Sequence, residues 1–201
     1  MRRIFCILPF IAVCFQIYSQ DQAQKSLKIG LYTNIGINQP IRFSENSSEY
    51  EFRGRGSYSA GVKISKFISE KTLVEIASYY TDHKVAFEYV NDIVLDKRWP
   101  TETFETFDIQ VLLKNYFKRN YYLDFGSIID FPIAGRLKSR TDTQSGFGIS
   151  IGIGRNVVLS NYTIEITPNL EIHSLIPFNS IANQQRLFVL GFKIELNNNC
   201  P

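Results

Sequence analysis

The chain has 201 residues, which is enough for one domain with a sizeable core. Hydrophobic residues make up 44% and charged residues 20% of the sequence, which argues against disorder, and aromatic residues reach 14%, more than a typical soluble domain needs. The formal net charge of +3 falls to +1 without Arg2 and Arg3, which lie in a predicted leader, so the charge balance gives no reason to expect a nucleic-acid partner.

The N-terminal residues are typical of a secretory signal peptide. Two arginines follow Met1, residues 4–15 form an apolar centre, and Ser19 is a small residue before the expected cleavage point. The apolar centre is too short to span a bilayer, which needs roughly 20 residues. We therefore expect a signal peptide over residues 1–19, followed by one domain over residues 20–201.

The cysteines fit an exported chain. Cys6 and Cys14 lie in the expected signal peptide, which leaves Cys200 as the remaining cysteine of the exported chain. Such a chain contains neither an intramolecular disulfide nor a cysteine-based metal site. Acylation of Cys14 would instead make a membrane-anchored lipoprotein, but Val13 is larger than the usual residue before such a cysteine.

Beyond the leader, apolar side chains recur at every second position, which is typical of β-strands with one apolar and one polar face. The alternation predicts strands over residues 27–37, 58–65, 74–80, 107–114, 123–131, 147–154, 163–173 and 190–196. The total is about eight strands, and single-chain outer-membrane barrels have an even number.

The connections between these strands alternate between long and short. Long ones are expected over residues 38–56, 89–102, 134–146 and 174–186. Outer-membrane barrels have short periplasmic turns and longer extracellular loops, so this rhythm predicts that both termini lie in the periplasm.

The polar face of the predicted strands carries charges and the other face is apolar. The charged residues on the polar face are Lys28, Lys63, Glu75, Asp108, Lys114, Asp124, Glu165, Glu171 and Lys193. Aromatic residues near the strand ends suggest girdles at the two membrane interfaces: Tyr116, Phe117, Tyr121, Tyr122 and Tyr162 at one end, and Tyr80, Phe87, Phe131 and Phe147 at the other. Both features favour lipid outside and polar side chains inside.

The sequence therefore predicts an all-β fold, a single antiparallel up-and-down transmembrane β-barrel of about eight strands in the cell outer membrane. A barrel of this size has room inside only for side chains, so opposite charges are expected to pair across a filled lumen. The alternative is a soluble, lipocalin-like barrel with the faces reversed, which would bind a small apolar ligand.

One pair of strands carries a family resemblance. Residues 107–117 (FDIQVLLKNYF) and residues 121–126 (YYLDFG), separated by a short turn, resemble the fourth and fifth strands of the PorT-like outer-membrane β-barrel family of Gram-negative bacteria. The likeness extends loosely over residues 27–196. The resemblance implies an outer-membrane barrel and, from one family member's association with protein secretion, a secretion-related role as one option.

No residue pattern points to catalysis, a cofactor or a metal. His173 and Ser174, near Glu171, are the closest approach to the histidine and serine of a lipid-modifying barrel enzyme, but neighbours in a strand point to opposite faces. His83, the other histidine, is expected at a strand rim with too few ligands nearby for a metal. We expect a non-enzymatic protein.

Binding is expected in the outer loops. Arg53 and Arg55 can bind lipopolysaccharide phosphates through their guanidinium groups, and Trp99 can anchor a protein partner or ligand. The expected partners are outer-membrane lipid, lipopolysaccharide and a protein that contacts the loops. The leading hypothesis is a barrel with structural, binding or secretion-associated roles, and a lipid-modifying enzyme is the third option.

Overall fold

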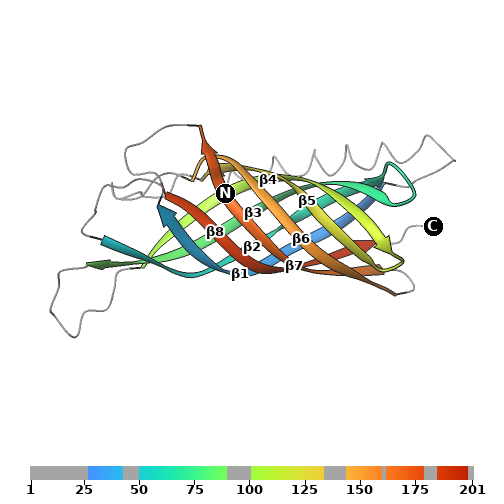
Figure 1. Cartoon of the computed structure of the whole chain (residues 1–201), viewed down its shortest axis with the longest axis horizontal. Helices are drawn as coiled ribbons and strands as arrows, with labels where there is room; N and C mark the ends of the chain where they lie inside the picture. Colours follow the sequence, from blue (N-terminus) through green and yellow to red (C-terminus); the bar gives the residue numbers. More distant parts are fainter. Residues whose placement is uncertain are drawn as a thin grey trace, which may run out of the picture.

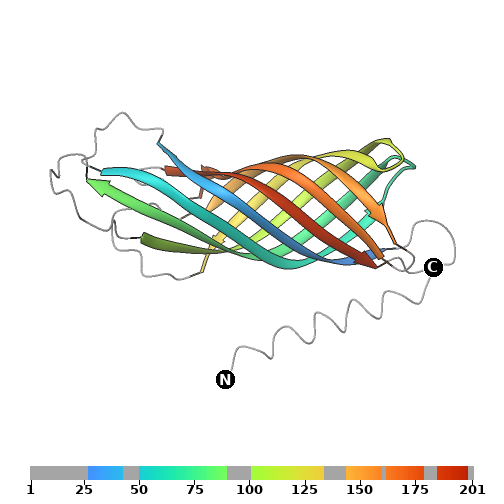
Figure 2. The same cartoon turned by 90° about the horizontal axis from the view of Figure 1, so that it is seen from below.

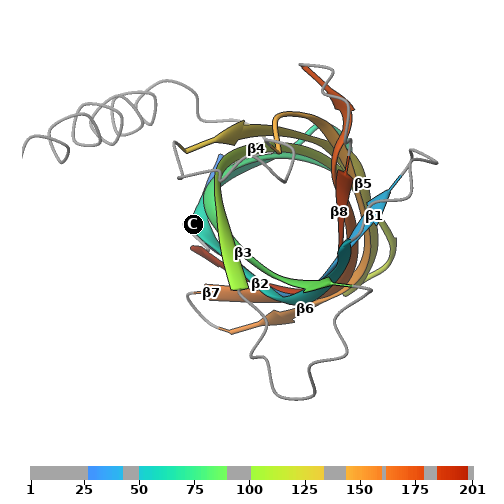
Figure 3. The same ribbon diagram turned by 90° about the vertical axis from the view of Figure 1, so that its left-hand side faces the viewer.

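The computed structural model describes residues 27–42, 50–89, 101–133, 144–159, 162–178 and 185–198, which form eight antiparallel strands (Figure 1). They are β1 (Lys28–Arg42), β2 (Tyr50–Phe67), β3 (Thr72–Tyr89), β4 (Thr101–Lys118), β5 (Tyr121–Pro132), β6 (Gly146–Val158), β7 (Tyr162–Pro177) and β8 (Gln185–Asn198). Each strand pairs with its neighbour in sequence and β1 pairs with β8, which closes the up-and-down barrel seen end-on in Figure 3. None of the described residues belongs to a helix long and apolar enough to cross a membrane.

Side chains alternate between the two faces of the sheet, and the apolar ones point outward. Leu31, Val62 and Ile151 are 59%, 56% and 54% exposed, whereas a soluble protein buries such side chains. Lys63 and Glu75 are each 1% exposed and point into the lumen. This arrangement confirms the prediction of lipid outside and polar side chains inside, and it contradicts the lipocalin-like alternative.

Closure of the barrel satisfies the backbone. The register between β1 and β8 runs without interruption from the Gly30 and Asn197 pair to the Arg42 and Gln185 pair. An unpaired N–H or C=O group in hydrocarbon costs several kcal/mol, because no water is present to replace the hydrogen bond. The chain therefore presents no open sheet edge to lipid along this seam.

Several strands are longer than the sequence predicts. Residues 38–56 were expected to form a loop, but β1 continues to Arg42 and β2 begins at Tyr50. The pairing of β2 with β3 reaches Tyr50 and Tyr89, and the ends of both strands project from the barrel at the left of Figures 1 and 2. A membrane crossing needs about 9–11 residues per strand, so the extra length lies outside the bilayer, where the apolar alternation that marks a strand disappears.

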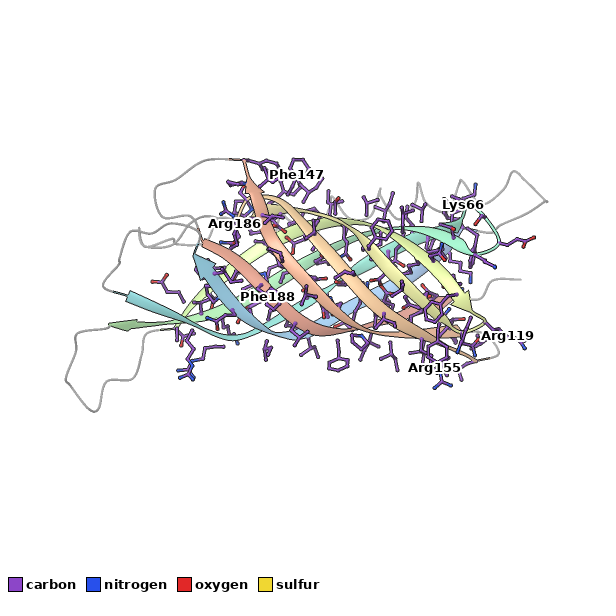
Figure 4. The ribbon with its side chains drawn as sticks, viewed as in Figure 1. Lys66, Arg119, Phe147, Arg155, Arg186 and Phe188 are labelled. Carbon is purple, nitrogen blue, oxygen red and sulfur yellow. The ribbon has the colours of Figure 1, made fainter. Side chains whose placement is uncertain are left out.

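The short turns lie at the opposite end. The turn between β2 and β3 places Ser69 Oγ 3.0 Å from the backbone N–H of Thr72, which donates to it, and only Arg119 and Asn120 separate β4 from β5. Figure 4 shows Arg119 and Lys66 at this end of the barrel and Phe147 toward the other. We call the end with the short turns the periplasmic end, following the rule for outer-membrane barrels, and the other the outer end.

The predicted aromatic girdles are correct in part. Phe117, Tyr121 and Tyr162 are exposed at the periplasmic end, as expected for a girdle. Tyr122 is fully buried and Tyr116 is half-buried beside it, with ring centroids 5.3 Å apart, so both belong to the lumen. Neighbouring residues in a strand face opposite sides, so they cannot share one girdle. Tyr80, Phe131 and Phe147 are exposed toward the outer end, and the side chain of Phe87 lies outside the described residues.

Candidate functional site

Seven charged side chains meet inside the barrel, and we call them the lysine–carboxylate network. Its members are Lys63, Glu75, Lys114, Asp124, Glu165, Lys193 and Glu195, each at most 4% exposed. Lys63 Nζ lies 2.8 Å from Glu75 Oε2 and 2.7 Å from Glu195 Oε2. Lys114 Nζ lies 2.6 Å from Glu165 Oε2. The prediction that opposite charges pair across the lumen is confirmed.

The register of β7 and β8 explains the position of two of these lysines. Glu165 and Glu195 are direct cross-strand partners whose side chains both point inward. Like charges in this position repel each other. Lys63 on β2 and Lys114 on β4 each contact both carboxylates, at N–O distances from 2.5 to 3.3 Å. The two ammonium groups balance the glutamates and occupy the space between the strands.

A layer of aromatic side chains follows the network toward the outer end. Along the inner face of β3, Glu75 of the network is followed by Ala77 and then by Tyr79. The ring of Tyr79 stacks on Tyr32 of β1 with a centroid distance of 4.5 Å and an interplanar angle of 11°. Both rings are at most 2% exposed, so they fill the lumen at this level.

The next inward positions bring the two histidines together. We call His83, Asp108, Asp130 and His173 the histidine–aspartate cluster; they come from β3, β4, β5 and β7 and are at most 1% exposed. The rings of His83 and His173 meet edge to face with centroids 4.9 Å apart. His173 Nδ1 lies 2.9 Å from Asp130 Oδ1. The expectation that His83 lies at a strand rim is wrong, since its side chain is fully buried in the lumen.

The backbone at Ser174 completes this cluster. Ser174 adopts a left-handed φ of 51°, so its side chain is buried on the same side as His173. The expectation that the two residues point to opposite faces is therefore wrong. Ser174 donates from its backbone N–H and its Oγ to Asp130 Oδ2, at 2.5 and 2.9 Å. The hydroxyl is thus bonded to a carboxylate and forms no hydrogen bond with the imidazole among the described contacts.

An apolar layer covers the cluster on its outer side. Val85 is the next inward residue of β3 after His83 and packs with Phe104 and Leu187. All three are at most 8% exposed. The lumen thus contains, from the periplasmic end outward, a charged network, stacked tyrosines, a histidine–aspartate cluster and an apolar layer.

The structure relocates the residues predicted to bind partners. Arg53 and Arg55 lie in β2 instead of a loop, where a bulge between Gly54 and Gly56 interrupts the pairing with β3. Both arginine side chains are exposed. Trp99 lies outside the described residues.

The sequence did not predict the histidine–aspartate cluster. The four residues lie on separate strands, and a strand pattern gives the face of a residue but not its height in the barrel.

The comparisons with known proteins extend to the fold and no further. No protein-family profile matches the chain, and the curated proteins contain no match. Among solved structures, the chain resembles the outer membrane protein OprG of Pseudomonas aeruginosa with a TM-score of 0.50 and 10% identity, over 87% of this chain and 96% of OprG. It also matches de novo designed transmembrane β-barrels (TM-score 0.40, 8% identity, 88% of this chain and 99% of the design) and the outer membrane protein Ail of Yersinia pestis (TM-score 0.34, 12% identity, 83% and 98%).

Fold and surface together define the class of protein. The similarity to OprG establishes the fold of an outer-membrane β-barrel. Large apolar side chains cover the exterior along the middle of the strands, and the charged side chains of the lysine–carboxylate network point inside, as a lipid environment requires. The chain is an outer-membrane β-barrel protein of eight strands.

Proposed function

We propose that the protein is a non-enzymatic, non-conducting barrel that holds a binding surface at the outer face of the membrane. The filled lumen carries this proposal. Lys63 and Lys114 bridge the barrel between strands, and Tyr32 stacks on Tyr79 beyond them. A hydrated ion would have to displace buried ion pairs and aromatic rings to pass, at a cost of several kcal/mol for each broken pair.

Conductance in planar lipid bilayers tests the sealed lumen. The wild-type barrel is expected to insert without opening a channel. A double variant, Tyr32→Ala with Tyr79→Ala, removes both stacked rings but leaves the charged network in place, so it is also expected to open no channel. Stable single-channel conductance from the wild type would overturn the proposal, because it would require a continuous water path through the charged network.

The second part of the proposal concerns the outer end of β2 and β3. Arg53 and Arg55 are exposed there, and Lys84 is exposed on the neighbouring strand beside Gly56. Arginine forks bind phosphate oxygens in bidentate geometry, and the outer leaflet of the outer membrane presents phosphorylated lipid. These three cations support lipopolysaccharide as a partner of this surface, and a protein that contacts the outer loops as a further partner.

A binding assay separates phosphate recognition from general lipid affinity. Arg53→Ala combined with Arg55→Ala is expected to weaken binding of lipopolysaccharide by about 10-fold or more, as loss of charge-assisted hydrogen bonds predicts. The matched control is Arg155→Ala, since Arg155 is exposed at the periplasmic end. The assignment would be refuted if the double variant and the control variant bound intact lipopolysaccharide with equal affinity and also bound dephosphorylated lipid with equal affinity.

Two narrower assignments belong to the same proposal. Membership of the PorT-like family is supported by the resemblance of the β4 and β5 hairpin and would bring a secretion-associated role. Export through a signal peptide over residues 1–19 is supported by the sequence pattern of that segment. N-terminal sequencing of protein isolated from membranes is expected to begin near residue 20, and an intact Met1 would rule the cleavage out.

A further inference from the structure

The lumen contains two pairs of like charges that face each other directly across neighbouring strands. Glu165 and Glu195 form one pair, and Lys63 with Lys114 balances it. Asp108 and Asp130 form the other, as direct partners between β4 and β5, and each is fully buried. Such a pair is unfavourable unless a cation lies between or beside the carboxylates or one of them keeps its proton.

In the part of the chain that the structure describes, no lysine or arginine forms an ion pair with Asp108 or Asp130. Among the ion pairs of the described residues, Asp130 has only His173, and Asp108 has none. Asp108 Oδ2 accepts hydrogen bonds from Thr81 at 2.5 Å and Thr106 at 3.0 Å. Its other oxygen, Oδ1, has no hydrogen-bond partner among the described residues. The pair therefore has room for a further positive charge.

His83 supplies an independent observation. Its side chain is fully buried, and neither ring nitrogen has a hydrogen-bond partner in the described part of the chain. Buried polar atoms of this kind are normally paired, so two orphaned nitrogens on one ring call for a ligand. The ring lies edge to face against His173, which contacts Asp130. The orphaned side chain therefore borders His173, the histidine that contacts Asp130.

We propose that the histidine–aspartate cluster binds one divalent transition-metal ion of the Zn²⁺ type. Asp108, Asp130 and His173 each offer one ligand atom, and these atoms lie within 4.8 Å of one another. Ligand atoms around a tetrahedral Zn²⁺ at about 2.1 Å are about 3.4 Å apart. His173 Nδ1 and Asp130 Oδ1, now 2.9 Å apart, need to separate slightly, and Asp108 needs to move inward by roughly 1 Å or less. His83 adjoins His173 outside this group of atoms, and a rotation of its ring brings it into position as the fourth ligand. Imidazole nitrogen mixed with carboxylate oxygen favours first-row transition ions over Ca²⁺ and Mg²⁺.

The surrounding hydrogen bonds hold the ligands in place. Asp130 Oδ2 accepts from Ser174, which leaves Oδ1 facing His173 Nδ1. The ion takes the place of the proton between these two atoms. His173 Nε2 lies 3.5 Å from Glu171 Oε2, so Glu171 is placed to accept from the ring nitrogen that does not bind the metal. Outer contacts of this kind fix the orientation of a metal-binding histidine.

The charge balance distinguishes this cluster from the other group of acids in the lumen. A divalent cation with two neutral histidines cancels the charges of Asp108 and Asp130. Glu75, Glu165 and Glu195 also lie close enough to share a metal, but the ammonium groups of two lysines already contact all three. The three glutamates are therefore already paired with lysines, whereas Asp108 and Asp130 are the carboxylates that bind the metal.

The apolar layer bears on how the ion enters. Val85, Phe104 and Leu187 cover the cluster on the outer side, and the stacked tyrosines Tyr32 and Tyr79 close it on the periplasmic side. An ion enclosed between these layers exchanges slowly once the barrel has formed. Loading is therefore expected during folding, and the test must include refolding in the presence of metal.

Metal retention is measured first. The full chain, prepared without an affinity tag and with Cys200→Ser to remove a competing thiol, is refolded into detergent micelles with Zn²⁺ or with a chelator. After gel filtration, elemental analysis is expected to give about one Zn²⁺ per barrel in the first preparation and none in the second. A refolded barrel that keeps no Zn²⁺ would overturn the proposal and leave His173 as a simple ion-pair partner of Asp130.

Two conservative variants locate the site. His83→Phe keeps a ring in the lumen but removes both nitrogens, and Asp108→Asn keeps the oxygen that accepts from Thr81 and Thr106. Each is expected to lower Zn²⁺ affinity by at least about 10-fold, in competition with a fluorescent chelator during refolding. Tyr79→Phe is the matched control, because it removes a neighbouring hydroxyl that is no ligand, and its affinity is expected to equal that of the wild type.

A folding check keeps the result interpretable. Each variant is compared with the wild type by the mobility of boiled and unboiled samples, which reports barrel closure. If His83→Phe does not close, His83→Gln replaces it, since this residue keeps a polar side chain without an imidazole. Wild-type affinity in both folded ligand variants would place the bound metal elsewhere and refute the assignment. X-ray absorption of the Co²⁺-loaded barrel is expected to show nitrogen and oxygen ligands only.

Discussion

Replacement of Lys114 by methionine tests how much the lysine–carboxylate network stabilises the barrel. Lys114 Nζ contacts Glu75, Glu165 and Glu195 at 2.8, 2.6 and 2.5 Å, and the side chain is fully buried. Methionine matches the length of the lysine stem but leaves Glu75 and Glu165 with only Lys63, and Glu195 with Lys63 and a longer contact of 4.0 Å to Lys193. Removal of one partner from a buried ion pair costs about 3–5 kcal/mol, so Lys114→Met is expected to lower the free energy of unfolding by that amount.

The assay is equilibrium unfolding in urea with the protein in lipid vesicles, followed by circular dichroism and by gel mobility. Lys66→Met is the matched control, because Lys66 is exposed at the periplasmic end of β2, and a change within about 0.5 kcal/mol is expected. Lys114→Met combined with Glu165→Gln restores the charge balance and is expected to recover at least half of the loss. A loss below about 1 kcal/mol for Lys114→Met would refute the view that these carboxylates depend on two ammonium groups.

Two further predictions concern the two faces of the sheet. Gly154→Ala places a methyl group against the buried ring of Tyr122 and against Thr167, and a loss of about 1–3 kcal/mol is expected in the same urea assay; an unchanged midpoint would show that the lumen packs loosely there. Ile151→Lys puts a charge on the lipid face of β6, where Ile151 is 54% exposed, and a loss of about 2–4 kcal/mol is expected in vesicles; a neutral effect would mean that this face meets water.

The alternation in the sequence predicts the fold well, because a membrane barrel separates polar and apolar residues more sharply than most folds. The eight strands and the inward position of Lys63 and Lys193 follow from the alternation of polar and apolar residues. The same alternation could have predicted the position of His83. Every second residue of β3 faces inward, and His83 continues the series Glu75, Ala77, Tyr79 and Thr81.

The contacts between distant strands could not be predicted in this way. Lys63 and Glu195 are separated by 132 positions, and their contact depends on the stagger of all eight strands around the closed barrel. The alternation of polar and apolar residues gives the face of each residue but not its height along the barrel axis. The pairing of Asp108 with Asp130 therefore could not be predicted either. The left-handed backbone at Ser174 is a local irregularity that reverses the face of one residue, and no residue type marks it in advance.

The central claim is that the apolar faces of the strands meet lipid around a closed barrel. Membrane fractionation combined with gel mobility of boiled and unboiled samples tests it most directly, because closed membrane barrels resist detergent until they are heated. The protein is expected in the outer-membrane fraction, with a mobility that changes on boiling. Recovery of a protein that is soluble without detergent would contradict the claim, since a surface with residues such as Leu31 and Ile151 more than half exposed requires a lipid environment.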